Sequence, residues 1–357
     1  MIKREVDEKR AAAFADKMVN TLNTGALSLM ISIGHRTRLF DIMQGMSPST
    51  SDEIAQTAIL NERYVREWLG AMTVGGIIEH DPEGSRYYLP PEHAACLTRK
   101  AAPDNIAVFA QYMPVLGAVE DRIVECFENG GGVPYEEYKR FHEVMAEDSG
   151  QTVLPALIDT ILPLVSGAVA DLERGIEVLD IGCGSGRALN LLAKTYPNSR
   201  FTGYDLCEEA LEYGIMEAES NGVDNLRFDR RDLTHFNESS CYDLITAFDA
   251  IHDQKAPDKV LISVAQALRP EGTFLMQDIA GSSHVHRNLD HPIGPLLYTV
   301  SCLHCMSVSL AQGGPGLGAM WGEELALNML EEAGFRKIET KKLPHDFQNN
   351  YYVATLR

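Results

Sequence analysis

The chain has 357 residues, a formal net charge of −20 at pH 7 and 45% hydrophobic residues. This length suggests about two domains, and the negative charge repels polyanions, which argues against nucleic acid and acidic membrane surfaces as partners. The seven cysteines are odd in number and scattered, which argues against a disulfide framework and favours a reducing, cytoplasmic setting.

The first segment, residues 1–45, is expected to be helical because it is largely apolar and contains no proline. Its start, MIKREVDEKR, is charged and lacks a long apolar core, so no signal peptide is expected. We find no run of about 18 apolar residues, so we expect neither a transmembrane helix nor a membrane partner.

The next segment has the order of a winged helix. SPSTSDEIAQTA predicts a short helix, and NERYVREWLGAMTVGGII predicts a second one, with Asn61 as N-cap and Val65, Leu69 and Met72 at helical spacing. IIEHDPEGSRYYL then predicts a hairpin around an Asp-Pro-Glu-Gly turn.

Charge argues against DNA binding by this winged-helix-like segment. From His35 to Arg99 it has six basic and nine acidic residues, a net of −3 and the wrong sign for contacting phosphates. We therefore interpret residues 1–100 as a helical and winged-helix-like module for packing or dimerisation, and expect a homodimer.

The remainder predicts an α/β domain. Residues 101–170 look helical and are expected to cover an active site. From residue 171, strand-like runs alternate with helical ones, which indicates a parallel sheet covered on both faces. FRKIETKKL and NNYYVATLR follow each other without a helix between, which predicts a final antiparallel hairpin in the domain of residues 171–357.

A glycine-rich turn lies within EVLDIGCGSGRALNLL, directly after the first strand of this domain. Gly182, Gly184 and Gly186 stand at every second position, and the following helix offers its N-terminal N–H groups to a ligand. A dinucleotide fold requires GxGxxG, but position 187 is Arg187 and position 189 is Leu189. The spacing is therefore GxGxG.

This turn, preceded by the acid Asp180, resembles motif I of the class I S-adenosylmethionine (SAM) methyltransferases. The resemblance continues with Asp205 at the end of FTGYD, with Asp232-Leu233 in RRDLTHF and with ALRPEGTFLMQD. It implies a Rossmann-like sheet that binds SAM, with Asp205 on the ribose hydroxyls. Two roles stay open for Asp180, a cap of the turn or a contact to the methionine amino group. The implied cofactor-binding residues are Asp180, Gly182, Gly184, Gly186, Asp205, Leu206, Asp232, Leu233 and Phe248.

FDAIHDQ follows the fourth predicted strand and gives the candidate catalytic residues. Ligands of open parallel sheets bind outside the carboxyl ends of the strands, so His252 and Asp253 are expected near the transferred methyl group. His252 is then a general base. The alternative is a solvated loop histidine.

A narrower resemblance involves His304, in YTVSCLHCMSVSLAQGG. With His252, Asp253 and the N-terminal module, it resembles a group that includes metal-dependent 2-oxo-acid C-methyltransferases and small-thiol S-methyltransferases. This resemblance implies that His252, Asp253 and His304 hold iron or zinc, which would acidify a chelated acceptor. The alternative is a metal-free O-methyltransferase in which His252 is the base and His304 an interior histidine.

Other candidate residues are less specific. Cys302 and Cys305 form a single CxxC without a second ligand pair, and His284 and His286 are spaced as loop residues. Two aromatic residues, Tyr112 and Trp321, are candidates for a substrate wall, although both positions also suit core residues.

The sequence thus predicts a SAM-dependent methyltransferase acting on a small molecule, either a small thiol or a 2-oxo acid. Two rival interpretations are a winged-helix transcription regulator that senses SAM and a non-catalytic SAM-binding partner of another enzyme. The identity of the acceptor atom is left open, because carbon, sulfur and oxygen nucleophiles all suit this fold.

Overall fold

The computed structural model describes residues 6–357. Residues 1–5, where the charged N-terminal stretch begins, lie outside the described residues. The contact pattern divides the chain into two compact units, Met1–Pro114 and Val115–Arg357. The predicted three-part division at residues 100 and 170 stays a prediction.

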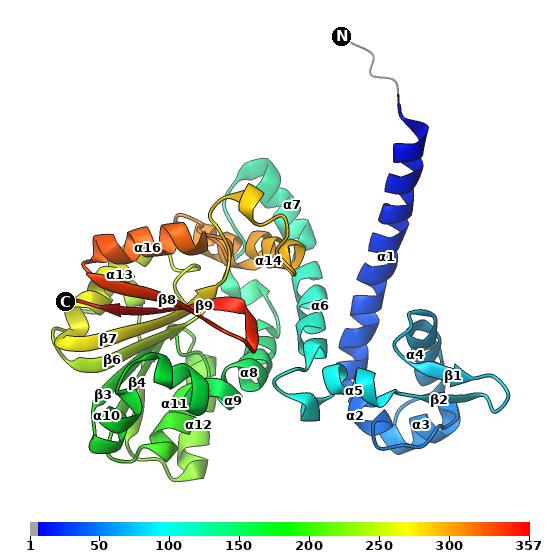
Figure 1. Cartoon of the computed structure of the whole chain (residues 1–357), viewed down its shortest axis with the longest axis horizontal. Coiled ribbons are helices and arrows are strands. Elements are labelled where there is room, and N and C mark those ends of the chain that lie inside the picture. Colours follow the sequence, from blue (N-terminus) through cyan, green and yellow to red (C-terminus); the bar gives the residue numbers. More distant parts are fainter. Residues whose placement is uncertain (1–5) are drawn as a thin grey trace. The chain divides into compact units, whose positions relative to one another are not determined.

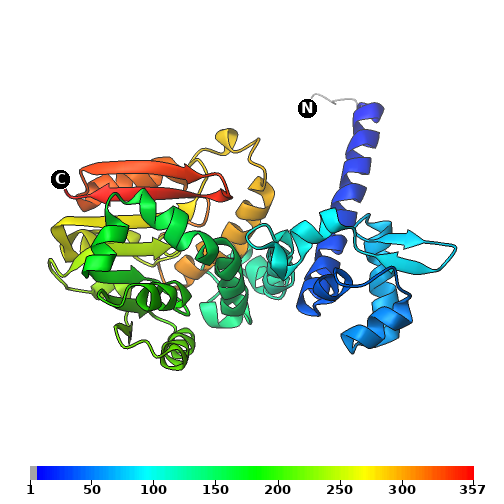
Figure 2. The same ribbon diagram turned by 60° about the horizontal axis from the view of Figure 1, so that its bottom comes forward.

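The first unit holds the expected helices and wing. A capping box of Thr50 and Glu53 begins the third helix, and the Asn61 side chain caps the fourth as predicted. Figure 2 shows the hairpin, in cyan, that forms the wing. The elements are α1 (Glu8–Arg36), α2 (Leu39–Met43), α3 (Ser51–Ala58), α4 (Glu62–Val74), β1 (Glu79–Asp81), β2 (Arg86–Tyr88), α5 (Pro91–Leu97), η1 (Arg99–Ala101) and η2 (Ile106–Gln111).

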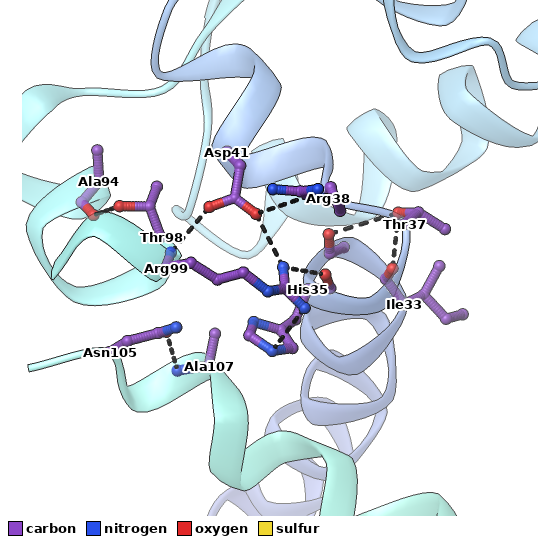
Figure 3. A network of polar contacts seen from close by, with 11 residues as sticks. Ile33, His35, Thr37, Arg38, Asp41, Ala94, Thr98, Arg99, Asn105 and Ala107 are labelled. Atoms are coloured by element: carbon purple, nitrogen blue, oxygen red, sulfur yellow. Dashed lines mark hydrogen bonds and ion pairs between the residues drawn. The ribbon is translucent and has the colours of Figure 1, made fainter. Parts of the chain in front are cut away.

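A polar network joins the C-terminal end of α1 to α2 and η1 (Figure 3). The guanidinium of Arg99 donates to the backbone oxygen of His35 at 2.9 Å and to the Asp41 carboxylate at 2.8 Å. The backbone N–H of Arg99 donates to the same carboxylate, also at 2.8 Å. Because one side chain pairs with both helices, this network fixes the base of α1 within the first unit.

Helices surround a seven-stranded sheet in the second unit (Figure 1). The strands are β3 (Glu177–Ile181), β4 (Arg200–Asp205), β5 (Leu226–Arg230), β6 (Tyr242–Phe248), β7 (Leu268–Ile279), β8 (Lys337–Leu343) and β9 (Asp346–Thr355). The main helices are α7 (Glu120–Asn129), α8 (Phe141–Thr152), α10 (Ala168–Arg174), α11 (Arg187–Thr195), α12 (Glu208–Asn221), α13 (Pro257–Ala267), α14 (Gly294–Val300), α15 (Met306–Ala311) and α16 (Gly322–Ala333). Shorter turns are α6 (Tyr112–Gly117), η3 (Tyr135–Glu137), α9 (Leu154–Ala156), η4 (Leu157–Ile161), η5 (Leu162–Leu164), η6 (Leu233–His235), η7 (Val285–Arg287) and η8 (Ser301–Cys305).

The order of the strands is β5-β4-β3-β6-β7-β9-β8. Strands β3 to β7 pair in parallel, whereas β9 pairs antiparallel with both β7 and β8. The predicted terminal hairpin is therefore confirmed. Parallel strands end at one edge of the sheet, so the loops after β3, β4, β6 and β7 meet there and form the expected place for a ligand.

Both faces of this sheet are buried, as the near-continuous apolar strands predict. One hydrophobic cluster packs α13 and α16 against the sheet through Val260, Leu261 and Leu330. A second cluster packs α10 and α11 through Leu172 and Leu189. Figure 1 shows these two helix pairs on opposite faces. This packing makes the sheet a firm support for the loops at its edge.

One helical stretch, Gly294–Ala311, passes a test for membrane spans by length and composition, contrary to the sequence expectation. A bent pair, Phe141–Leu164 with Ala168–Arg174, passes when counted together. Core helices of folded domains pass the same test, and 44% of Gly294–Ala311 is buried within the fold. Its Leu297 and Cys305 belong to a small hydrophobic cluster.

Candidate active site

The glycine turn connects β3 to α11. Gly182, Gly184 and Gly186 all have positive φ, at 66°, 53° and 63°. A Cβ atom at Gly186 would approach the Phe228 ring to 2.2 Å, whereas one at Gly184 would meet nothing within 4 Å. The turn is therefore packed closely at its end and open at Gly184, which leaves room for a ligand against the backbone.

Asp205, at the end of β4, holds this turn in place. One of its carboxylate oxygens accepts a hydrogen bond from the backbone N–H of Gly184 at 2.8 Å. The other accepts from the backbone N–H of Cys207, also at 2.8 Å. Each oxygen has a further lone pair, so the carboxylate can still accept hydrogen bonds from a diol beside Gly184.

Asp180 stands on β3, two residues before Gly182, and both roles considered for it stay predictions. Its carboxylate is 3% exposed and accepts a hydrogen bond from the Thr246 hydroxyl at 2.7 Å. Burial raises the pKa of Asp180 to about 7, although the bond from Thr246 opposes this, and the charge of Asp205 raises it further. A cationic group bound beside Asp180 would favour the ionised carboxylate.

The other residues expected at the cofactor lie in different surroundings. Asp232 is paired with Lys255 at 2.5 Å, and although burial acts to raise its pKa, the bonds from Lys255 and Thr234 lower it to about 2. Leu233 is part of the core, and Leu206 is exposed. Phe248 ends β6 and is partly buried.

His252 and Asp278 form a buried pair, which we call the dyad. The Nδ1 atom of His252 lies 2.8 Å from a carboxylate oxygen of Asp278, and the two side chains are 5% and 1% exposed. The same oxygen accepts from the Trp321 indole N–H at 3.0 Å. With Nδ1–H donating to Asp278, Nε2 carries the lone pair.

The dyad has a raised affinity for protons. Burial acts to lower the pKa of His252, but the charges of Asp278 and Cys305 hold it well above the usual value. Burial also raises the pKa of the neighbouring Asp253 to about 6, against the opposing effect of His252. Pairs of this kind, a histidine oriented by a carboxylate, serve as general bases.

Sequence reasoning did not find Asp278, which stands near the end of β7 in GTFLMQDI. The signal that could have identified Asp278 is a carboxylate near the end of an otherwise apolar strand. Asp249, after β6, was also missed. It has a left-handed backbone, φ 51°, and accepts a hydrogen bond from Gln277 at 2.9 Å. Such backbone strain in a non-glycine residue is common at functional sites.

His304 is buried and is surrounded by aromatic rings. It stacks on Phe141 with ring centroids 3.5 Å apart and an interplanar angle of 8°, and it meets the edges of Tyr138 and Tyr135. Neither ring nitrogen has a hydrogen-bond partner. Burial, followed by the charges of His252 and His142, lowers the pKa of His304 well below its usual value, so the ring is neutral.

The residues expected to bind iron or zinc do not form a suitable set. Among the side chains that the structure describes, no group of three His, Cys, Asp or Glu is close enough to hold a metal. Nδ1 of His252 is already bonded to Asp278. The arrangement therefore gives no support to the triad of His252, Asp253 and His304, and we derive no metal-dependent step.

The less specific candidates are also located. Trp321 is buried against Asp278, so it orients the dyad through its indole N–H. Tyr112 is buried in the first unit, and its role at a substrate remains a prediction. His284 and His286 stack on each other with their centroids 5.7 Å apart. Cys302 and Cys305 are free thiols.

Two family models match the chain. Residues 172–334 match the model of a family described as a methyltransferase domain. The matched residues lie within the second unit. Residues 25–99 match a second model, described as an Rv2258c-like winged HTH domain. The expected α/β methyltransferase sheet with an N-terminal winged-helix module is confirmed.

Curated relatives match parts of this chain. A fatty-acid O-methyltransferase of Mycolicibacterium smegmatis is 31% identical over 32% of this chain and 40% of its own length. N-methyltransferase 4 of Papaver somniferum is 29% identical over 30% of each chain. A ubiquinone biosynthesis O-methyltransferase of Actinobacillus pleuropneumoniae is 28% identical over 29% of this chain and 46% of its own. The chain thus spans less than half the length of these relatives, whose names include both oxygen and nitrogen acceptors.

Solved structures match over nearly the whole chain. Mitomycin 7-O-methyltransferase has a TM-score of 0.67 at 16% identity, covering 97% of this chain and 99% of that one. Human N-acetylserotonin methyltransferase, solved with SAM, has a TM-score of 0.65 at 14% identity, covering 99% of both chains. At these identities the likeness shows the fold alone.

Proposed function

We propose that this protein transfers a methyl group from SAM to a small-molecule acceptor, with His252 as general base. The observation that carries the proposal is the buried dyad, which stands at the same edge of the sheet as the open glycine turn and Asp205. A base next to a turn that can accommodate adenosine is the combination that methyl transfer requires.

In the proposed reaction, Asp205 accepts the ribose hydroxyls, and the buried acids near the turn favour a positive charge. When bound, SAM supplies a methyl group activated by its sulfonium charge. Nε2 of His252 takes the proton from the acceptor, and Asp278 holds Nδ1–H and stabilises the imidazolium. The acceptor atom then forms the new bond to carbon, and orientation by the site supplies much of the rate enhancement.

Of the two acceptor classes expected from the sequence, we propose uncharged nucleophiles such as thiols and alcohols over 2-oxo acids. The charged groups that shift the pKa values of His252 and Asp253 are acids, imidazoles and thiols. The same is true of Tyr135, so the largest influences on these pKa values include acids but neither Lys nor Arg. A carboxylate on the acceptor would meet repulsion there.

The test is isothermal titration with SAM, followed by detection of S-adenosylhomocysteine in the presence of small thiols and alcohols. The proposal expects one binding site, lost in a variant combining Asp205→Ala with Gly184→Val, and turnover that requires His252. Wild-type protein that fails to bind SAM would contradict it. Binding without turnover would instead favour a non-catalytic SAM-binding partner.

A SAM-sensing regulator is a second candidate, because residues 25–99 match a winged HTH family. The net charge of −3 from His35 to Arg99 disfavours contact with phosphates. A gel-shift assay at low salt with random duplex DNA separates the two: we expect no shift, and a salt-sensitive complex would favour the regulator.

We also propose that the protein is a homodimer that pairs through α1. Residues 7–26 are exposed along their whole length, and they include Phe14, Met18 and Leu22 on one face. Most of the stability of a helix in a protein comes from packing of its apolar face, which the exposed part of α1 lacks in a single chain. Residues 8–26 hold three basic and two acidic residues, so this face repels a second copy much less than the acidic remainder does.

A further inference from the structure

His304, in the second unit, is a buried histidine that the proposed reaction does not use. It belongs to η8, a π-helical turn between α14 and α15, and it is 2% exposed. Both ring nitrogens are buried without a hydrogen-bond partner. Buried polar groups are almost always paired, so an orphaned imidazole calls for a specific explanation. Single π-turns within helices are also frequent at functional sites.

The ring of His304 is held in one orientation. Phe141 covers one face, with centroids 3.5 Å apart. The edges of Tyr138 and Tyr135 meet it at centroid distances of 4.7 and 5.2 Å and interplanar angles of 75° and 82°. We call Tyr135, Tyr138 and Phe141 the aromatic wall. Stacking of this kind fixes the plane in which the two nitrogens lie.

The segment that carries the wall is fastened to the helix that carries His304. The Tyr138 hydroxyl donates to the backbone oxygen of Leu303 at 2.5 Å, and the backbone N–H of Val133 donates to the Ser307 hydroxyl at 2.8 Å. A Cβ atom at Gly132 would approach the Ser307 backbone oxygen to 1.9 Å, so the two backbones are nearly in contact. The wall and the ring therefore form one rigid unit.

The chemistry of this unit is neutral hydrogen bonding. Burial keeps His304 uncharged, and a neutral imidazole offers one N–H donor and one lone pair. His252 is one of the two charged groups that act on His304. The ring thus stands within electrostatic reach of the proposed base, with its polar atoms unused by the protein.

We propose that His304 determines acceptor specificity by hydrogen-bonding a second, uncharged polar group of the acceptor while the first group reacts at His252. The preferred acceptors are then small bifunctional molecules, such as vicinal diols or hydroxythiols, rather than molecules with a single hydroxyl or thiol. This inference rests on the proposed methyl transfer. A site built to pair with a polar group discriminates strongly against analogues that lack it, because its own polar atoms then stay unpaired.

The test compares matched acceptors in a methyl-transfer assay: catechol with phenol, and 2-mercaptoethanol with ethanethiol. The wild type should prefer the bifunctional member of each pair by about tenfold or more in kcat/KM, mainly through KM. His304→Phe keeps a flat ring on Phe141 but removes both nitrogens. It should abolish the preference, chiefly by lowering kcat/KM for the bifunctional member of each pair. Cys302→Ala, on the same turn, is the matched control and should keep the preference.

Three results would overturn the inference. One is a preference that survives in His304→Phe. Another is an equal loss of rate on both members of each pair together with a lowered Tm, which would mean a structural role. The third is a preference that disappears after chelation and returns with iron or zinc, which would make the nitrogens metal ligands. Failure of the proposed function is seen separately, as absence of SAM binding or of S-adenosylhomocysteine with every acceptor.

Discussion

The side chain on which the proposed chemistry depends is His252, and its partner Asp278 controls its charge. We predict that His252→Gln lowers kcat by about 10²- to 10⁴-fold, the range expected for loss of a general base, with SAM affinity unchanged in calorimetry. A variant that keeps more than half the wild-type rate would rule out this role.

The pH dependence of the rate tests the dyad itself. Because the pKa of His252 is raised, the base gains activity as pH rises above the usual histidine range. Asp278→Asn keeps the shape but removes the charge, so the acidic limb of the kcat/KM profile should move to lower pH and the maximum should fall. A limb that stays in place, measured from pH 6 to 9.5, would mean that Asp278 is not coupled to the base.

Asp180 should make the ligand-free protein sensitive to pH. Its pKa is raised to about 7 in the folded state, so its contribution to stability is complete below the unfolded value and is lost as pH rises through 7. Asp180→Asn removes the ionisation. The free energy of unfolding of this variant relative to wild type should therefore increase from pH 5 to pH 8 by up to about 3 kcal/mol, with a corresponding rise in relative Tm. A pH-independent difference in Tm would contradict this.

For single residues, the sequence predicted those that lie in ordered motifs. It missed those whose role depends on contacts between distant parts of the chain. Gly184 and Asp205 stand at strand ends in a recognisable order, and the structure joins them by a hydrogen bond. The neighbours of the histidines come from distant positions. Asp278 meets His252 from the next strand, and Phe141 meets His304 across more than 160 residues of sequence. Spacing contains no information on such pairs.

Among the elements, the role of the turn between β3 and α11 can be tested with a control substitution at a second glycine of the same unit, Gly222. Gly184 and Gly222 both have positive φ, 53° and 66°, and a Cβ atom on either would meet nothing within 4 Å. Each substitution by alanine should cost a similar free energy of about 1 kcal/mol from backbone strain. Only Gly184→Ala should also weaken SAM binding, because only that Cβ enters the proposed ligand space.

Calorimetry and thermal unfolding on both variants check this prediction. Equal loss of SAM affinity in Gly222→Ala would show that the effect is general destabilisation. Unchanged affinity in Gly184→Ala would remove the turn from the binding site.

The exposed half of α1 gives a second prediction at this scale. Phe14 and Leu22 stand four residues on either side of Met18, so a two-fold axis at Met18 would bring each Phe14 to the Leu22 of the second copy, as an isologous interface requires. Leu22→Lys should convert a particle of twice 39.4 kDa to a single chain in light scattering. Thr24→Lys, also exposed but turned away from this face, should not. A wild-type monomer would contradict the proposed pairing.

For the whole molecule, alternation of strands and helices was enough to predict the architecture. The parallel sheet, the terminal hairpin and the winged module follow from local patterns, because a run of buried β-branched residues between turns has few other uses. The predicted metal site, in contrast, could not be judged from local patterns. It needs three side chains to converge in space, and the described side chains bring no such group together.

The chain as a whole combines a winged module of net negative charge with a second domain whose proposed base is deeply buried. Burial of the dyad fits a reaction that must exclude water, because a reactive methyl group would otherwise be lost to solvent. The acidic surroundings of the turn favour the positively charged donor over its neutral product. This difference would assist product release after each turnover.

The most direct test of the account is a crystal structure of the protein with S-adenosylhomocysteine. The account predicts the ribose hydroxyls at Asp205, the adenosyl chain over Gly184, and the thioether sulfur facing Nε2 of His252. A nucleotide that runs away from His252, or a crevice at Gly184 filled by protein side chains, would contradict it.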